Sequence, residues 1–210
     1  MKRSFWILCI LILGMFNNVI AQLSTTKKDY LVTISTDLGE IQLILFDATP
    51  KHKENFIKLT QRGFYNGTTF HRVIDNFMIQ GGDTLSKDEN TQNDGMGTLG
   101  YTIPAEFVDS LIHNRGMLAA ARLGDAVNPA RASSSCQFYI VQAKTGTHFL
   151  DKQYTVYGKV IKGLAVVDAI ALVPKDTRDR PLKDIRMKVT VKLVKKKKIA
   201  KIIAKESSSK

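Results

Sequence analysis

The strongest constraint on the fold of this chain is an alternation of apolar and polar residues near its C-terminal end. Apolar side chains occupy every second position from Ile185 to Leu193, and mostly basic residues stand between them. A period of two is that of a β-strand with one buried and one exposed face, so a strand is predicted over residues 185–194. A similar pattern at Ile41–Leu45 follows a predicted hairpin loop at residues 37–39. The globular part is therefore expected to begin and end with strands.

Two helices are predicted between these strands. The first has Thr49 as its N-cap and Pro50 at its first helical position. The second places apolar residues on one face between Leu164 and Ala171 and stops before Pro174. Two helices among many short strands favour a closed antiparallel sheet, because an open sheet would leave strand edges unpaired.

Two polar segments, residues 83–100 and 124–135, are predicted to be long surface loops. A pair of long loops in a compact domain usually frames a functional site. The second segment ends in the serine run Ser133–Ser135, for which no partnering base is recognisable. We therefore expect this run to be flexible loop.

The first 21 residues are predicted to be a secretory signal peptide. Lys2 and Arg3 precede an apolar run, Phe5–Phe16, and Ala21 offers a small residue at a cleavage site. The run is shorter than the roughly 20 apolar residues of a transmembrane helix. We expect cleavage after Ala21, a short leader over residues 22–29, and secretion across the inner membrane into the periplasm.

The net charge of +12 is concentrated in one segment. From Arg186 to the end, ten basic residues face a single acid, Glu206, and contribute +9. The rest of the chain is nearly balanced, so the charge does not indicate a nucleic-acid-binding domain. Residues 195–210 are predicted to be a basic tail that is solvated and frayed. The alternative is a basic amphipathic segment, with Ile199, Ile202 and Ile203 at helical spacing, that makes weak contact with acidic surfaces.

Patterns typical of metal, cofactor or nucleophile chemistry are absent from the sequence. The four histidines lack metal-ligand spacing, and there is no Cys-x-x-Cys pair, P-loop, dinucleotide fingerprint or G-x-S-x-G motif. Removal of the signal peptide would leave Cys136 alone, so no internal disulfide is expected. We expect no metal and no cofactor.

One segment, Phe70–Asp83, carries the functional signal with the string FHRVIDNFMIQGGD. By composition alone it would be an ordinary sheet segment, with Phe77 and Met78 in the core and Arg72 extending to solvent. The full string, however, resembles the signature of cyclophilin-type peptidyl-prolyl cis-trans isomerases. The resemblance continues in the family's order at residues 116–121, 135–141, 149–151 and 156–160. It spans the predicted domain, residues 30–194.

The resemblance implies a mainly β fold, a closed eight-stranded antiparallel barrel capped by two α-helices. It implies an enzyme that catalyses rotation about Xaa-Pro bonds in proline-containing polypeptides lying across the outside of the barrel. Together with the signal peptide, this predicts a role in the folding of exported proteins. We expect a monomer with no nucleic-acid partner. The alternative is a binding module or holdase whose isomerase activity is incidental, and the presence of Arg72 favours the enzyme.

The resemblance also implies which residues form the site. Arg72 matches the catalytic arginine of the family. Phe77, Met78 and Leu150 match three walls of a proline pocket, and Tyr139 stands where the family usually has phenylalanine. The added hydroxyl of this tyrosine must find water or a partner.

The remaining site positions are polar or lie at the rim. Gln80 and Gln137 match residues that hold the peptide backbone or the arginine. Ala121 and Arg122 match a strand edge that hydrogen-bonds the residues before proline, and Arg122 replaces a common asparagine. Two rim positions stand where eukaryotic members often have tryptophan and histidine: Phe149 and Tyr154.

Overall fold

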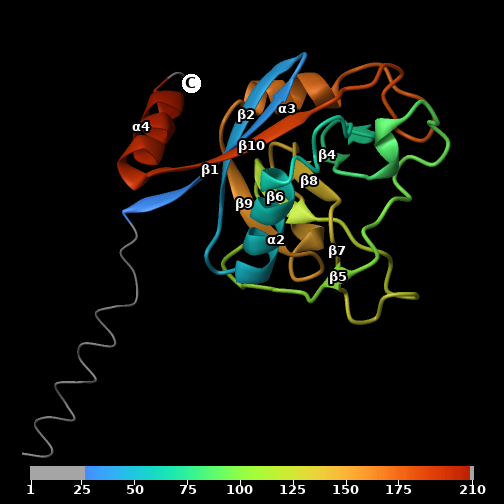
Figure 1. The fold of residues 1–210 in the computed structure, drawn as a ribbon, viewed down its shortest axis with the longest axis horizontal. Coiled ribbons are helices and arrows are strands. Elements are labelled where there is room, and N and C mark those ends of the chain that lie inside the picture. The colour runs from blue at the N-terminus through green and yellow to red at the C-terminus, as the bar shows by residue number, and fades with distance from the viewer. Residues whose placement is uncertain (1–26, 209–210) are drawn as a thin grey trace, which may run out of the picture.

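The structure is a computed structural model that describes residues 27–208 (Figure 1). These residues contain ten strands and three α-helices. The predicted signal peptide and residues 22–26 of the leader lie outside the described residues. None of the described helices is long and apolar enough to cross a bilayer. The strands of the main sheet are β1 (Lys28–Thr36), β2 (Gly39–Leu45), β3 (Arg72–Ile74), β4 (Met78–Gly81), β6 (Met117–Ala120), β8 (Phe138–Val141), β9 (Val156–Lys162) and β10 (Lys188–Lys195).

The described strands of the main sheet pair antiparallel in the order β10-β1-β2-β9-β6-β8-β4-β3. The two end strands, β3 and β10, share no ladder, but the segments just before them join the sheet ends. Gly67 N–H donates to the Met187 carbonyl at 2.9 Å, and Phe70 N–H donates to the Ile185 carbonyl at 3.0 Å. Met187 N–H returns a bond to the Thr68 carbonyl at 2.8 Å. These bonds close the sheet, as the predicted eight-stranded barrel requires.

The two predicted helices are confirmed as α2 (Pro50–Gln61) and α3 (Leu164–Ala171). Phe56 of α2 and Ile170 of α3 are both buried in the main hydrophobic core. The apolar face of each helix therefore packs against the core inside the barrel. Figure 1 shows both helices beside the main sheet.

The predicted N-cap of α2 differs in its hydrogen bond. The Thr49 hydroxyl donates to the Phe46 carbonyl at 3.4 Å and does not cap the helix. The Glu106 carboxylate, from a distant loop, instead accepts the backbone N–H groups of Lys51 at 3.1 Å and His52 at 3.0 Å. A negative charge at the helix N-terminus satisfies the same unpaired donors that a cap would.

The C-terminal segment is not frayed, and this expectation was wrong. Residues 196–207 form a further helix, α4 (Lys196–Ser207), which lies against the barrel. Ile199 is buried beside Leu31 of β1 and Ile161 of β9. Ile199 therefore provides the apolar contact that isolated short helices lack.

The last predicted strand is also displaced. The strand β10 begins at Lys188, because the buried residues Ile185 and Met187 belong to the closure bonds rather than to the ladder. At the other end Leu193 is 54% exposed, and Val194 packs against α4 instead.

The serine run is a strand rather than a flexible loop. Ser133–Ser134 form β7, which pairs antiparallel with β5 (Thr102–Ile103). The neighbouring Ser135 is buried, its hydroxyl accepts the Leu99 N–H at 3.3 Å, and its carbonyl accepts the Asn55 side-chain amide at 2.7 Å. Small hydroxyl side chains fit this crowded position because their polar atoms are satisfied there.

Replacing Ile199 with alanine should lower the free energy of unfolding by about 2–3 kcal/mol, because the truncation leaves a cavity between α4 and the barrel. Ile203→Ala is the matched control on the same helix, where the side chain is 40% exposed. Denaturant unfolding of both variants measures the difference. Equal, small losses in the two variants would contradict the docking of α4.

Candidate active site

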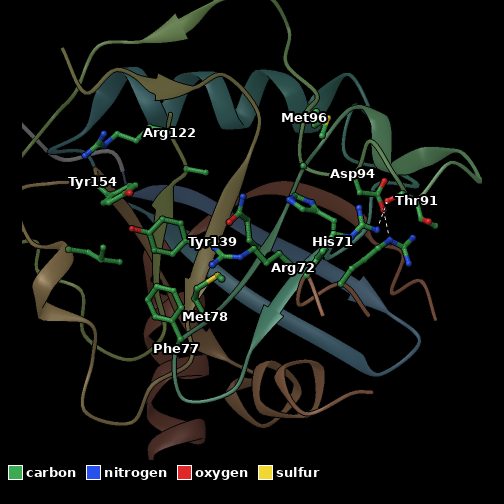
Figure 2. Close-up of a pocket in the computed structure, with 16 residues that line it drawn as sticks. His71, Arg72, Phe77, Met78, Thr91, Asp94, Met96, Arg122, Tyr139 and Tyr154 are labelled. Carbon is green, nitrogen blue, oxygen red and sulfur yellow. Dashed lines mark hydrogen bonds and ion pairs between the residues drawn. The ribbon is translucent and has the colours of Figure 1, made fainter. Parts of the chain in front are cut away.

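A cavity of about 420 Å³ lies on the outside of the barrel, where most of the predicted site residues meet (Figure 2). Two predicted residues do not line it. Gln137 lies behind Gln80, to which it is hydrogen-bonded, and Phe149 is 72% exposed and stacks on Phe77 with ring centroids 5.8 Å apart. The predicted residues that line the cavity are Arg72, Phe77, Met78, Gln80, Ala121, Arg122, Tyr139, Leu150 and Tyr154.

Strand geometry explains why apolar side chains gather outside the barrel. Along β4, Ile79 points into the main core, so Met78 and Gln80 on either side of it point outward. Tyr139 of β8 lies opposite Gln80 in the register. Met78 and Tyr139 belong to a second apolar cluster, separate from the core, against which Leu150 also packs. This cluster forms the apolar part of the cavity.

The hydroxyl of Tyr139 has a buried partner. It lies 2.9 Å from Nε2 of His113, whose Nδ1 is 2.8 Å from the Asp151 carboxylate. Burial lowers the pKa of His113 more than Asp151 raises it, so the ring is neutral at pH 7. We assign the proton to Nδ1, which donates to Asp151, and Nε2 then accepts the tyrosine O–H. Tyr139 therefore presents its ring to the cavity with its hydroxyl already satisfied.

Arg72 is the cavity cation that has no partner among the described residues. It opens β3 and lies opposite Gln80, and Figure 2 shows its side chain reaching toward Met78 and Tyr139. Among the described residues its guanidinium makes no hydrogen bond or ion pair with the protein. The other arginines lining the cavity each pair with a carboxylate: Arg122 with Asp125 at 2.6 Å, Arg178 with Asp176 at 3.5 Å, and Arg180 with Asp94 at 2.6 Å.

The two glutamines tie β4 to the loop at residues 83–100. The side-chain amide of Gln80 donates to the side-chain oxygen Oε1 of Gln137 at 3.1 Å. The Gln137 amide donates in turn to the carbonyls of Gly95 and Gly97, each at 2.9 Å. These side chains therefore fix the loop that forms one wall of the cavity.

Ala121 and Arg122 differ in what their backbones offer. Ala121 N–H donates to the Gln137 carbonyl, and its own carbonyl accepts the Ser134 N–H. The backbone N–H and carbonyl of Arg122 have no partner among the described residues. Its side chain is held away from them, with Nε donating to the Gln153 carbonyl at 2.8 Å and the guanidinium 4.5 Å from the Tyr154 ring. An extended peptide can therefore pair with the backbone of Arg122 whatever its side chain is.

Seven further residues line the cavity without having been singled out from the sequence. The loop at 83–100 was expected to frame a site and supplies four of them. Nothing in the sequence was a reason to select His71 beyond its position next to Arg72. No sequence pattern indicated a role for Arg178 and Arg180, which lie in the segment before β10. These residues are His71, Thr91, Asp94, Gly95, Met96, Arg178 and Arg180.

His71 adds no second positive charge beside Arg72. The side chain is buried, and neither ring nitrogen has a hydrogen-bond partner in the described part of the chain. Burial lowers the pKa of His71 to about 4, against a smaller opposing effect of the Asp83 carboxylate. The ring is therefore neutral at pH 7. Within the described residues no cluster of three or more histidine, cysteine, aspartate or glutamate side chains could hold a metal ion.

The family model for cyclophilin type peptidyl-prolyl cis-trans isomerases matches residues 31–191. The chain belongs to this family. This cyclophilin is a peptidyl-prolyl cis-trans isomerase, and the cavity lies on the barrel face where the family resemblance predicted the substrate.

The sequences of similar proteins align with nearly the whole domain of this cyclophilin. Peptidyl-prolyl cis-trans isomerase CYP18-1 of Arabidopsis thaliana is 42% identical over 163 residues, which are 76% of this chain and 94% of that protein. Peptidyl-prolyl cis-trans isomerase-like 3 of Dictyostelium discoideum is 40% identical over 159 residues, 75% of this chain and 91% of that protein.

Solved structures show the same fold. The crystal structure of a Cryptosporidium parvum cyclophilin type isomerase superposes with a TM-score of 0.68 at 27% identity, covering 79% of this chain and 98% of that one. A second structure of that protein, determined in the presence of the dipeptide Ala-Pro, gives a TM-score of 0.67 at 27% identity over 77% and 98% of the two chains. The eight-stranded antiparallel barrel with its helices is thus the cyclophilin fold.

Replacing Tyr139 with phenylalanine should destabilise this cyclophilin by about 1–3 kcal/mol, because Nε2 of the buried His113 loses its donor. Isomerase kcat/KM should stay within about threefold of the original, because the ring remains. Tyr154→Phe is the matched control, since its hydroxyl has no partner among the described residues. Urea unfolding and a peptide assay measure both effects. Equal stability losses in the two variants would contradict the assigned hydrogen bond.

Proposed function

We propose that Arg72 is the catalytic group of this isomerase and that the apolar part of the cavity holds the proline ring of the substrate. The observation that carries the proposal is the guanidinium itself. It has no partner within the described protein, whereas the other cavity arginines are all paired. A cation kept unpaired beside an apolar cavity has its donors available for a substrate.

The reaction explains why an arginine suffices. Rotation about the Xaa-Pro bond breaks no covalent bond, and its barrier of about 18–20 kcal/mol comes from the loss of amide resonance. As the bond twists, the nitrogen becomes pyramidal and its lone pair can accept a hydrogen bond. A forked, permanently charged guanidinium can donate to that lone pair and to a neighbouring carbonyl. This interaction strengthens only in the twisted state, which is the condition for catalysis.

The surrounding residues hold the two sides of the rotating bond differently. Met78, Tyr139 and Leu150 form the apolar surface against which the pyrrolidine ring packs. The open backbone of Arg122 pairs with the residues before proline. The ring is thus immobilised while the acyl side turns, and the low polarity of the cavity strengthens the effect of Arg72.

Arg72→Ala should lower kcat/KM by at least about 100-fold, or roughly 2.7 kcal/mol of transition-state stabilisation, while the fold is retained. The kcat/KM of Arg72→Lys should lie between those of Arg72→Ala and the original protein, because the positive charge remains while the forked pair of N–H donors is lost. Arg62→Ala, an exposed arginine at the end of α2, serves as the control. A chromogenic proline-peptide assay measures all three. A folded Arg72→Ala variant within a few-fold of the original would overturn the assignment.

We further propose that this cyclophilin is a bacterial periplasmic monomer that assists the folding of exported proteins. The support is the basic, apolar and small-residue pattern of residues 1–21 and the departures at Phe149 and Tyr154. The relatives named above are eukaryotic proteins, so the compartment rests on the sequence of this chain. No nucleic-acid partner is proposed, because the excess charge is confined to the C-terminal segment.

Residues 1–21 fused to a phosphatase that needs disulfides should give an active enzyme in a bacterial host, because its disulfides form only after export. The same fusion carrying Ile10→Arg and Leu11→Arg should stay inactive, since charges interrupt the apolar run. Phosphatase activity and the N-terminal sequence of the product are the measurements. Inactivity of both fusions would contradict export.

A further inference from the structure

The first turn of α4 carries a charge arrangement that does not favour the helix. Lys196, Lys197 and Lys198 stand in this turn, and no acidic residue accompanies them. Cations at a helix N-terminus face the positive end of the helix dipole, which is unfavourable. The residue before the helix, Lys195, provides no side-chain cap either. The stability of α4 therefore gives no reason for these lysines.

Contacts with the barrel fix the orientation of α4 about its axis. Ile199 is buried against β1 and β9, Ile202 packs beside it, and the Glu206 carboxylate accepts the Gly163 N–H at 3.1 Å. The face of the helix opposite these residues carries Lys197 and Lys201, one turn apart and both exposed. Their ammonium groups repel each other at this spacing, and an external anion would relieve that repulsion.

Neighbouring lysines extend this surface. Lys28 of β1 lies opposite Lys195 of β10, and the Lys27 carbonyl accepts the Lys196 N–H at 2.9 Å. None of these exposed ammonium groups has an ion-pair partner within the described residues. We call this surface the α4 patch, which consists of Lys27, Lys28, Lys195, Lys196, Lys197, Lys198 and Lys201.

The chemistry of the α4 patch favours a lipid surface over a nucleic acid. Its cations are all lysines, with no arginine to form forked contacts to phosphate. One exposed apolar side chain stands on the helix itself, Ile203 at 40% exposure. Lysines beside exposed aliphatic side chains are typical of helices that lie in a membrane interface.

We propose that the α4 patch binds the anionic phospholipid headgroups of a membrane surface. Figure 1 shows α4 on the side of the barrel away from the loop at 83–100, which forms a wall of the cavity. Binding through α4 therefore leaves the cavity open to polypeptides. The membrane that is met depends on the proposed export, whereas the binding itself depends on neither export nor catalysis.

The test compares charge reversals at α4 with equal reversals elsewhere. Lys197→Glu, Lys198→Glu and Lys201→Glu are combined in one full-length variant. The control combines Lys58→Glu, Lys144→Glu and Lys183→Glu, which are exposed lysines outside the α4 patch and have the same effect on net charge. The measured quantity is the ratio of affinities for phosphatidylglycerol-containing and pure phosphatidylcholine vesicles. Any contribution of the apolar segment at residues 5–16 to both affinities cancels in this ratio.

The α4 variant should lose at least about 100-fold in this ratio, because each lysine near an anionic surface contributes about fivefold. The control should change only a few-fold, and added salt should weaken the binding of the original protein. Both variants should isomerise short peptides at the original rate, which separates this proposal from the role of Arg72. Equal losses in the two variants, no preference of the original for anionic vesicles, or tighter binding to a random DNA duplex would each overturn the proposal.

Discussion

The register between β4 and β8 is the constraint on which the site depends. Because side chains alternate along a strand, Ile79 fills the barrel core while Met78, one residue before it, faces the cavity. A slip of one residue would exchange the two surfaces and remove both. The end of β4 is held by close packing. A side chain at Gly81 would meet the Met187 methyl group at 2.7 Å and the Thr69 carbonyl at 2.8 Å, both next to the bonds that close the barrel. The segments that close the sheet therefore also pack against the end of the strand that carries Met78 and Gln80.

The electrostatics of the cavity follow from how its charges are paired. No hydrogen bond or ion pair with the described residues occupies the donors of Arg72, and the neighbouring His71 is neutral and adds no second cation. On the apolar side, the polar atom of Tyr139 is removed from the substrate surface by His113. Within the described part of the chain, the cavity thus offers an apolar surface and one cation, Arg72, without a partner. That combination suits a reaction in which a hydrogen-bond acceptor appears only as the amide twists.

The sequence predicted those parts of the fold that local patterns determine. Helix α2 has Pro50 at its first position and α3 has a continuous apolar face, so both were predictable. Nine of the residues that line the cavity followed from the family resemblance, which preserves the order of the motifs. Helix α4 was only the alternative to a frayed tail, because lysines crowd its first turn and its stability comes from the contact of Ile199 with distant strands. Arg178 and Arg180 were missed because only the folded chain brings their segment to the cavity.

The central claim is that Arg72 acts on the twisted amide rather than on the bound peptide. Exchange NMR with a proline-containing peptide measures the ground-state Kd and the rate of isomerisation on the enzyme in one experiment. For Arg72→Ala, the account predicts a Kd within a few-fold of the original and an on-enzyme rate at least about 100-fold slower. A Kd weakened in proportion to the loss of activity, with an unchanged on-enzyme rate, would contradict it.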